Sequence, residues 1–394
     1  MGYRRNPETE KSTDMEYTFL QQYWWFIVSL LGGLLVFLMF VQGANTMIFS
    51  VGRTELGRTM VVNSTGRKWE FTFTTLVTFG GAFFASFPLF YSTSFGGAYW
   101  LWVLILVSFV FQAVSYEFQT RPGNILGRNT FRIFLVANGY LGPFLVGAAV
   151  ATFFTGSDFI VDKGAIGDGI SPVISRWGNP WHGLDALANV WNIILGLAVV
   201  FLSKILGSLY MLNNIDDGGI SSRIRKGLLP LAVAFLVFFL AFLGHVLTGQ
   251  GYAVASDGTV SVEPFKYWHN LVEMPAVLAI FLVGVLAVLY GIIKTIACGR
   301  YRRGIWWTGA GAVLAVLSIF LIAGYNGTAY YPSTSDLQSS LTISNSCSSF
   351  FTLKTMMYVS FIIPFVLAYI AYAWWSMDRK PVTREEMSVT ADKY

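Results

Sequence analysis

The chain has 394 residues, of which 55% are hydrophobic and 12% are charged, and its formal net charge is +5. Soluble domains carry about 25% charged residues, so this composition excludes an ordinary soluble protein. The basic residues stand in short clusters between long apolar runs, which favours anchoring at a membrane surface and argues against a nucleic-acid partner. We therefore expect an integral membrane protein surrounded by lipids.

A polar N-terminal segment, residues 1–18, is followed by nine apolar segments. Each is close to the ~20 residues that a helix needs to cross about 30 Å of hydrocarbon, so the sequence predicts an all-α fold with about nine transmembrane helices. Aromatic pairs such as Trp24-Trp25 and Trp306-Trp307 stand at segment ends, as is typical of membrane–water interfaces. The nine predicted helices cover residues 23–46, 73–90, 98–118, 131–154, 183–212, 228–247, 271–293, 306–324 and 353–375.

A weak internal similarity divides the chain into two halves. Residues 42–47, at the end of the first predicted helix, resemble residues 207–211, at the end of the fifth. Because the two stretches lie four helices apart, we expect two four-helix bundles and one additional helix. The expected parts are a first bundle at 19–154, an extracytoplasmic loop at 155–182, a second bundle at 183–326, an outer loop with the ninth helix at 327–376, and a cytoplasmic tail at 377–394.

The basic residues indicate the orientation of the chain. With nine helices the two termini lie on opposite sides of the membrane, and 19 of the 26 Lys and Arg residues fall on the side of the odd-numbered loops and the C-terminal tail. Cytoplasmic loops usually carry this excess of positive charge. We therefore expect an extracytoplasmic N-terminus and a cytoplasmic C-terminus. The two cysteines, Cys298 and Cys347, then lie on opposite faces and cannot pair.

Two carboxylates at the cytoplasmic ends of predicted helices are candidates for function. Glu70 stands at the start of the second helix and Glu117 at the end of the third, and about seven residues join these helices, so we expect a hairpin with neighbouring carboxylates. A carboxylate near a like charge in a low dielectric can exchange protons near neutral pH. The simpler alternative is that both pair with Arg67, Lys68 and Arg121 at the lipid headgroups.

Three amide side chains extend this polar region toward the membrane centre. Gln42 and Asn45 lie at the inner end of the first predicted helix, and Gln112 lies one to two helical turns deeper than Glu117. Together with the carboxylates they predict a polar track that would admit protons from the cytoplasm.

The three histidines, His182, His245 and His269, lie near predicted outer helix ends. Antiparallel sixth and seventh helices could bring His245 and His269 together as haem ligands, since imidazole is a common axial ligand. The favoured interpretation is that His269 forms a hydrogen-bonded pair with Glu273, one turn along the same helix. The sequence contains no phosphate-binding loop, zinc-spaced ligand set or nucleophile triad, so catalysis of the soluble-enzyme type is not expected.

Several stretches follow the order found in subunit II of cytochrome bd-type quinol oxidases. They include Gln42-Gly43-Ala44-Asn45-Thr46-Met47, Trp69-Glu70, Gly80-Gly81-Ala82-Phe83-Phe84, Tyr331-Pro332-Ser333 and Val382-Thr383-Arg384-Glu385-Glu386. Chain length, helix number and hydropathy spacing agree as well. The chain therefore resembles this family over essentially its whole length, with a weaker match at about 156–266.

The resemblance implies a membrane oxidase that takes electrons from a quinol and reduces dioxygen to water with cytoplasmic protons. In this family the haem b and haem d groups and the quinol-oxidising loop belong to subunit I. Subunit II packs against subunit I, carries part of a proton path and sometimes binds a quinone. We therefore expect the non-haem subunit of a heterodimeric oxidase in a bacterial cell membrane, with no catalytic residues of its own and with small accessory subunits as further candidate partners.

The resemblance also assigns residues to the proton path. The family's acidic residue after a tryptophan falls on Glu70, which follows Trp69. Its acidic residue at the end of the third helix falls on Glu117, and a basic residue, Arg121, follows four positions later. These matches favour proton transfer over headgroup pairing.

Three departures from the family pattern remove ionisable side chains from this path. Two aspartates common at the end of the first helix are replaced by Gln42 and Asn45, and an arginine deeper in the third helix is replaced by Gln112. Amides cannot ionise, so proton delivery could run through waters beside Glu70 or through subunit I.

Two other functions compete with an oxidase subunit. A polytopic secondary transporter is also built from repeated helix bundles, but its interrupted helices place charges near the midplane, whereas the carboxylates here lie at helix ends. A pure assembly scaffold would have no proton role, and its activity would not depend on Glu70.

Overall fold

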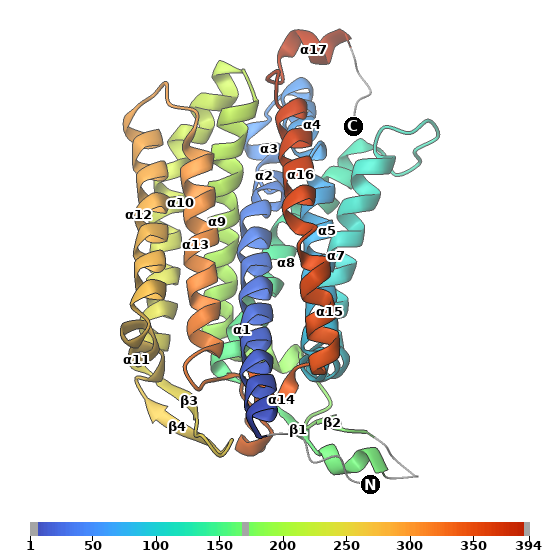
Figure 1. Ribbon diagram of the computed structural model, residues 1–394. Coiled ribbons are helices and arrows are strands. Elements are labelled where there is room, and N and C mark those ends of the chain that lie inside the picture. Colours follow the sequence, from blue (N-terminus) through green and yellow to red (C-terminus); the bar gives the residue numbers. More distant parts are fainter. Residues whose placement is uncertain (1–6, 168–172, 390–394) are drawn as a thin grey trace.

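The computed structural model describes residues 7–167 and 173–389, and long helices stand side by side in it (Figure 1). Helix α1 (Pro7–Leu38) begins at the end that carries short β-strands, which we call the sheet end. Helix α17 (Arg384–Val389) lies at the opposite end, which we call the tail end. The expectation of an all-α membrane fold is confirmed.

In the described part of the chain, seven helices are long and apolar enough to cross a membrane, and two bent helix pairs raise the number to nine. This number agrees with the sequence prediction. The first of the seven continues from α1 into α2 (Phe40–Asn45). The other six are α7 (Tyr99–Phe118), α8 (Arg128–Thr155), α9 (Val190–Asn214), α10 (Gly218–Thr248), α12 (Pro275–Ala297) and α13 (Gly304–Gly324).

Both bent pairs break at a proline. Helices α4 (Glu55–Gly66) and α5 (Trp69–Ser86) precede Pro88, and the chain turns by 116° into α6 (Pro88–Phe90) and η1 (Tyr91–Gly97). The second predicted helix, 73–90, was therefore shifted by four residues from α5, which starts at Trp69 and ends at Ser86, because a residue before proline avoids helical geometry. Helices α15 (Phe350–Ser360) and α16 (Ile363–Met377) meet at 40°, since Pro364 lacks the N–H that would bond to Ser360.

Several other boundaries differ from prediction, among them the start of α10, which is Gly218 and not 228. Residues 7–18 form the first turns of α1 and are not a separate polar segment, while residues 1–6 lie outside the described residues. Helix α9 begins at Val190, where the Asn189 side chain caps it, and not at 183. Helix α12 begins at Pro275, after a distinct helix α11 (Lys266–Glu273), and not at 271.

Three two-stranded antiparallel sheets and short helical turns lie at the sheet end (Figure 1). The region predicted as an extracytoplasmic loop, 155–182, contains the first sheet, although residues 168–172 lie outside the described residues. The strands are β1 (Phe159–Val161), β2 (Ser175–Trp177), β3 (Gln250–Val254), β4 (Val260–Pro264), β5 (Ala329–Tyr331) and β6 (Leu341–Thr342). The remaining turns are η2 (Lys163–Gly167), η3 (Leu184–Ala188), η4 (Leu337–Ser339), α3 (Ile48–Val51) near the tail end, and α14 (Ile343–Ser346).

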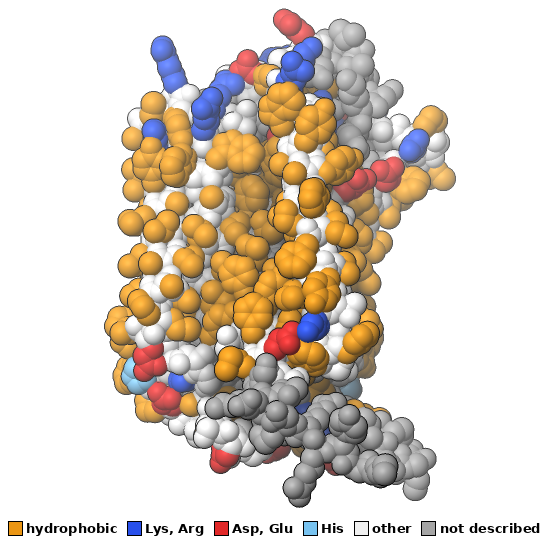
Figure 2. Space-filling model, in the orientation of Figure 1, with side chains coloured by type: hydrophobic (Ala, Val, Ile, Leu, Met, Phe, Trp, Pro, Cys, Tyr) orange, Lys and Arg blue, Asp and Glu red, His pale blue; other side chains and the backbone are white. Residues whose placement is uncertain are grey.

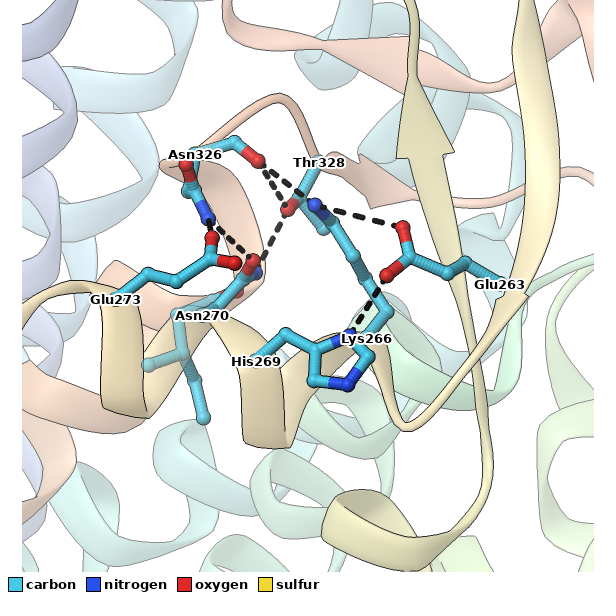
Figure 3. A network of polar contacts seen from close by, with 8 residues as sticks. Glu263, Lys266, His269, Asn270, Glu273, Asn326 and Thr328 are labelled. Atoms are coloured by element: carbon cyan, nitrogen blue, oxygen red, sulfur yellow. Dashed lines mark hydrogen bonds and ion pairs between the residues drawn. The ribbon is translucent and has the colours of Figure 1, made fainter.

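A polar network fixes α11 and the β3–β4 hairpin to the end of α13 (Figure 3). The buried Asn270 side chain donates to the Ile322 carbonyl oxygen at 2.7 Å, and Asn326 donates to Glu273 at 2.6 Å. The His269 ring bonds to Glu263 at 2.8 Å (Figure 3). The predicted His269–Glu273 pair was therefore wrong, because the hairpin brings a closer carboxylate to the histidine.

Helices of both predicted halves share one apolar core. Helix α1 packs on α13, α2 packs on α9, and α8 packs on α9, so helices far apart in sequence are neighbours. One core cluster joins Phe40 of α2, Leu135 of α8, Leu206 of α9 and Ile292 of α12. The division into two four-helix bundles, 19–154 and 183–326, stays a prediction.

Glycines allow α2 and α9 to cross at backbone contact. An added Cβ at Gly43 would overlap the backbone of Ser203, and one at Gly207 would overlap the backbone of Ala44. These glycines lie in the two stretches, 42–47 and 207–211, that resemble each other in sequence. The two similar segments therefore cross each other directly.

The segment predicted as a cytoplasmic tail folds back onto the bundle at the turn between α9 and α10. The Val382 amide donates to the Asn214 carbonyl oxygen at 2.8 Å, and Arg384 pairs with Asp217 at 2.5 Å. Burial alone would raise the pKa of Asp217, but hydrogen bonds from the Ile220 amide and from Arg384 lower it below the ordinary carboxyl value. This ion pair therefore persists at neutral pH and is lost as the pH falls through that lowered pKa.

Charged side chains are unevenly distributed along the bundle. The middle of the face seen in Figure 2 is hydrophobic, and lysine and arginine side chains gather at the tail end. The turn between α12 and α13 contributes Arg300, Arg302 and Arg303 there. The lipid-exposed belt and the basic end are thus visible in three dimensions.

Replacing Gly43 by alanine should destabilise the fold by about 1–3 kcal/mol, because the added methyl group forces α2 away from α9. The measurement is the thermal midpoint of the purified protein. Gly244→Ala in α10 is the matched control, since nothing lies within 4 Å of a Cβ added there. Equal midpoints for the two variants would contradict the close crossing.

Candidate functional site

Polar side chains of α2, α4 and α7 meet in the interior of the bundle. The Tyr116 hydroxyl donates to Asn45 Oδ1 at 2.7 Å and lies 2.8 Å from Thr65 Oγ1, which itself donates to Asn45 Oδ1 at 3.3 Å. All three side chains are fully or almost fully buried. A hydrogen-bonded polar node thus replaces apolar packing at this point.

A second polar contact lies one helical turn away from this node. Gln42 Nε2 donates to Gln112 Oε1 at 3.0 Å, and both residues are fully buried. Gln42 and Asn45 share one face of α2, and Gln112 and Tyr116 share one face of α7, because residues three or four apart lie above each other on a helix. The two facing pairs form a ladder, which we call the amide ladder.

The amide ladder continues toward the membrane centre through Ser108, one turn before Gln112 on α7. Asn138 of α8 donates to the backbone and hydroxyl oxygens of Ser108 at 3.0 and 3.1 Å. Sequence reasoning missed this extension and Tyr116, although polar residues at positions 108, 112 and 116 recur every four residues. That spacing could have revealed a polar stripe on α7.

Several buried polar atoms of the amide ladder have no hydrogen-bond partner among the described residues. They are Gln42 Oε1, Asn45 Nδ2, Gln112 Nε2 and Asn138 Oδ1. Trp69 stacks on Tyr116 with ring centroids 5.9 Å apart, and its buried indole N–H is likewise unpaired. Each such atom offers a hydrogen bond to an ordered water molecule, so the ladder has the chemistry of a wet polar path.

The two candidate carboxylates lie outside this ladder. Glu70 and Glu117 are both exposed, and no hydrogen bond or ion pair joins them. Glu117 pairs with Arg121 at 3.6 Å, as the headgroup alternative predicted. Glu70 makes no ion pair with any described residue, so it does not bind Arg67 or Lys68.

Lys68 instead pairs with an aspartate that sequence reasoning missed. Its ammonium group lies 2.9 Å from Asp378 Oδ1, and its side chain is completely buried. Asp378 follows α16 and was assigned to the cytoplasmic tail, 377–394. The two residues are 310 positions apart, and no local pattern in the sequence connects them.

The three histidines each have a structural contact. His182 Nδ1 bonds to the Gly97 carbonyl oxygen at 3.1 Å, and the His245 ring stacks on Trp191 at 3.8 Å. His269 bonds to Glu263, as described above. Within residues 7–167 and 173–389, no three His, Cys, Asp or Glu side chains gather as metal ligands.

An apolar cavity of about 70 Å³ lies between α1, α5, α8, α9, α10 and α13. Its lining consists of aliphatic, aromatic and glycine residues, among them Gly32, Phe79, Val146, Leu202 and Phe320. A quinone ring needs hydrogen-bond donors for its carbonyl oxygens, and this lining supplies none. The cavity therefore does not fit a quinone headgroup.

Comparison with known proteins identifies the family. The sequence model of cytochrome bd terminal oxidase subunit II matches residues 20–377. The chain belongs to this subunit II family.

Curated relatives of the subunit II family agree over nearly the whole chain. "Cytochrome bd-I ubiquinol oxidase subunit 2" of Escherichia coli K12 is 26% identical over 388 residues, which cover 95% of this chain and 98% of that protein. "Cytochrome bd ubiquinol oxidase subunit 2" of Bacillus subtilis 168 is 24% identical over 377 residues, with 92% and 98% covered. The transporter alternative is therefore not favoured.

The solved bd oxidase from Geobacillus thermodenitrificans has a similar fold. One of its chains aligns with a TM-score of 0.57 at 12% identity and covers 94% of this chain and 99% of its own length. Family and fold together make this chain a multi-pass membrane protein of a respiratory oxidoreductase family.

Tyr116→Phe should lower the free energy of unfolding by about 1 kcal/mol, because it removes a buried hydroxyl that bonds to both Asn45 and Thr65. The thermal midpoint of the purified protein measures this loss. Tyr91→Phe is the control, because its hydroxyl forms no hydrogen bond with a described residue. A midpoint for Tyr116→Phe that matches the control would show that the node contributes nothing to stability.

Proposed function

We propose that this chain is the non-haem subunit of a cytochrome bd quinol:dioxygen oxidoreductase in a bacterial cell membrane. The observation that carries the proposal is the match of residues 20–377 to the subunit II family. The haem b and haem d groups and the site of quinol oxidation belong to subunit I, so this chain contributes to catalysis only within the complex. Small accessory subunits and a bound quinone stay expectations of the family resemblance.

The tail end faces the cytoplasm in this proposal, and the N-terminus lies outside. Lysine and arginine side chains gather at the tail end, and the positive-inside rule associates such a cluster with the cytoplasmic face (Figure 2). Protons for the reduction of dioxygen then arrive at the end of the bundle that holds the amide ladder.

Subunit I packs against the face formed by α16. All residues from Ile363 to Tyr369 are exposed, and Trp374 alone in this helix is buried, so the first half of α16 is left uncovered by its own bundle. Aromatic side chains are enriched in protein interfaces, and this helix exposes Phe365, Tyr369, Tyr372 and Trp375. These features support a protein partner on this face.

Protons pass through this subunit along the amide ladder. Glu70 provides an exposed charge at the cytoplasmic surface, and Glu117 and Arg121 lie near the end of α7. Trp69 follows inward, because it stacks on Tyr116 of the ladder. The amide side chains of the ladder, Gln42, Asn45 and Gln112, cannot ionise. Their unpaired atoms can hold water molecules that conduct protons.

Glu70→Gln should slow quinol-driven oxygen consumption by about threefold or more, which is less than the ~10²-fold typical of a general acid because bulk water still supplies protons. Turnover and membrane potential are measured with the complex in proteoliposomes. Glu16→Gln at the sheet end is the control and should behave like the native protein, since its exposed pair with Lys354 contributes little. Unchanged turnover and potential in Glu70→Gln would leave only a scaffold role.

Phe365→Ala combined with Tyr369→Ala should weaken the association with subunit I, because buried aromatic side chains dominate interface energies. The measurement is the amount of haem protein that co-purifies with the tagged chain in mild detergent. Val237→Ala with Leu240→Ala on the exposed face of α10 is the matched control. Equal co-purification from both double variants would place the interface elsewhere.

A further inference from the structure

A buried ion pair lies at the tail end, next to the amide ladder. Lys68, between α4 and α5, and Asp378, after α16, are 2.9 Å apart, and their side chains are 0% and 12% exposed. The Lys68 ammonium group also lies over the Trp374 ring, 5.3 Å from its centroid. Two opposite charges are thus held inside the protein at the end of the ninth transmembrane helix.

Hydrogen bonds lead from this ion pair to Ser64 of α4, the residue before Thr65 of the amide ladder. Asp378 Oδ1 accepts from Asn214 at 3.0 Å, and Asn214 Oδ1 accepts from the Ser64 hydroxyl at 2.6 Å. The next residue in α4 is Thr65, which bonds to Asn45 and Tyr116. A polar connection therefore runs from Asp378 through α9 to α4, beside the ladder.

Asp378 has a free position for a proton. Its Oδ1 accepts hydrogen bonds from Lys68, Asn214 and, at 3.4 Å, the Tyr210 hydroxyl, whereas the buried Oδ2 has no partner among the described residues. The charged and titratable groups that face it are Lys68, Tyr210 and Arg67, which donates to the neighbouring Met377 carbonyl oxygen at 3.4 Å. A carboxylate oxygen without a donor can accept a proton while the other oxygen keeps its contacts.

A proton path along the amide ladder needs a group that can bind and release a proton. Gln42, Asn45 and Gln112 can orient water but cannot take up or release a proton. Glu70 and Glu117 can, but both are exposed and neither bonds to the ladder. Asp378 is a mostly buried carboxylate whose hydrogen bonds reach Ser64, the residue next to Thr65 of the ladder.

We propose that Asp378 is a proton-loading residue of this subunit and that Lys68 positions it and balances its charge. Uptake of a proton from the cytoplasmic side forms an O–H bond at Oδ2 and makes the carboxyl group neutral, while Lys68 remains an ammonium ion. Release of that proton toward the ladder restores the carboxylate and its ion pair. This inference rests on the proposed function, because the protons are those consumed in the reduction of dioxygen.

The competing explanation is structural. The pair could simply fasten the end of α16 to the α4–α5 turn. A buried ion pair with only a structural role can often be replaced by apolar residues of similar volume with little loss of stability, whereas removal of one partner leaves an uncompensated buried charge. The two explanations therefore predict different results for a double replacement.

The experiment is Lys68→Met with Asp378→Leu, expressed and purified with subunit I and reconstituted in proteoliposomes. We expect the complex to assemble, and quinol-driven oxygen consumption and proton uptake from the cytoplasmic side to fall about tenfold or more. Arg384→Gln is the control, because it removes another tail ion pair, with Asp217, without touching the ladder, and it should keep native turnover. Native turnover and proton uptake in the double variant would overturn the inference.

A second comparison decides the question if the double variant does not assemble. Asp378→Asn keeps the shape of the side chain but cannot load a proton, and Asp378→Glu keeps the carboxyl group. We expect Asp378→Glu to restore turnover and to displace its pH profile, while Asp378→Asn stays slow. Equal turnover in both would overturn the inference. Failure of the native complex to oxidise quinol would instead overturn the proposed function itself.

Discussion

The close crossing of α2 and α9 determines the arrangement of the tail end. Because Gly43 faces α9 without a side chain, the neighbouring positions Gln42 and Asn45 turn toward α7. Gly207, Tyr210 and Asn214 follow each other at intervals of three and four residues, so they share one face of α9. The contact at Gly207 therefore also directs the polar groups of α9 toward α4 and the end of α16. One backbone contact orients both polar sites.

The distribution of charge follows from the cost of burying it. A charged group in the membrane interior is costly unless it is paired, whereas an amide needs only hydrogen bonds. The interior here accordingly contains amides and hydroxyls, and the carboxylates Glu70 and Glu117 lie at the surface. Among the described residues, four charged side chains are buried, and each is paired with an opposite charge: Lys68, Arg132, Asp217 and Lys266. The amide ladder thus avoids the cost of burying charge by using uncharged groups, whereas Lys68 and Asp378 reduce that cost by pairing.

The sequence predicted the fold better than it predicted the site. Apolar length and basic loops are properties of contiguous residues, so nine membrane segments could be recognised, although Pro88 and Pro364 shortened or bent two of them. Gln42, Asn45 and Gln112 were identified as a group because they lie near helix ends that a short loop brings together. The exposure of Glu70 depends on the rotation of α5, and the partner of His269 depends on the β3–β4 hairpin. Neither the exposure of Glu70 nor the partner of His269 can be predicted from neighbouring residues in the sequence.

The distance in sequence between Lys68 and Asp378 has a consequence for biogenesis. The lysine is synthesised and inserted early, and its counter-ion leaves the ribosome 310 positions later. Until the ninth helix reaches its place, the tail end holds a basic group without its partner, and its interior remains open to water. Placement of the ninth helix, and not insertion of the first helices, therefore completes this ion pair. A chain that stops before residue 378 keeps this defect permanently, which marks it for removal by quality-control proteases.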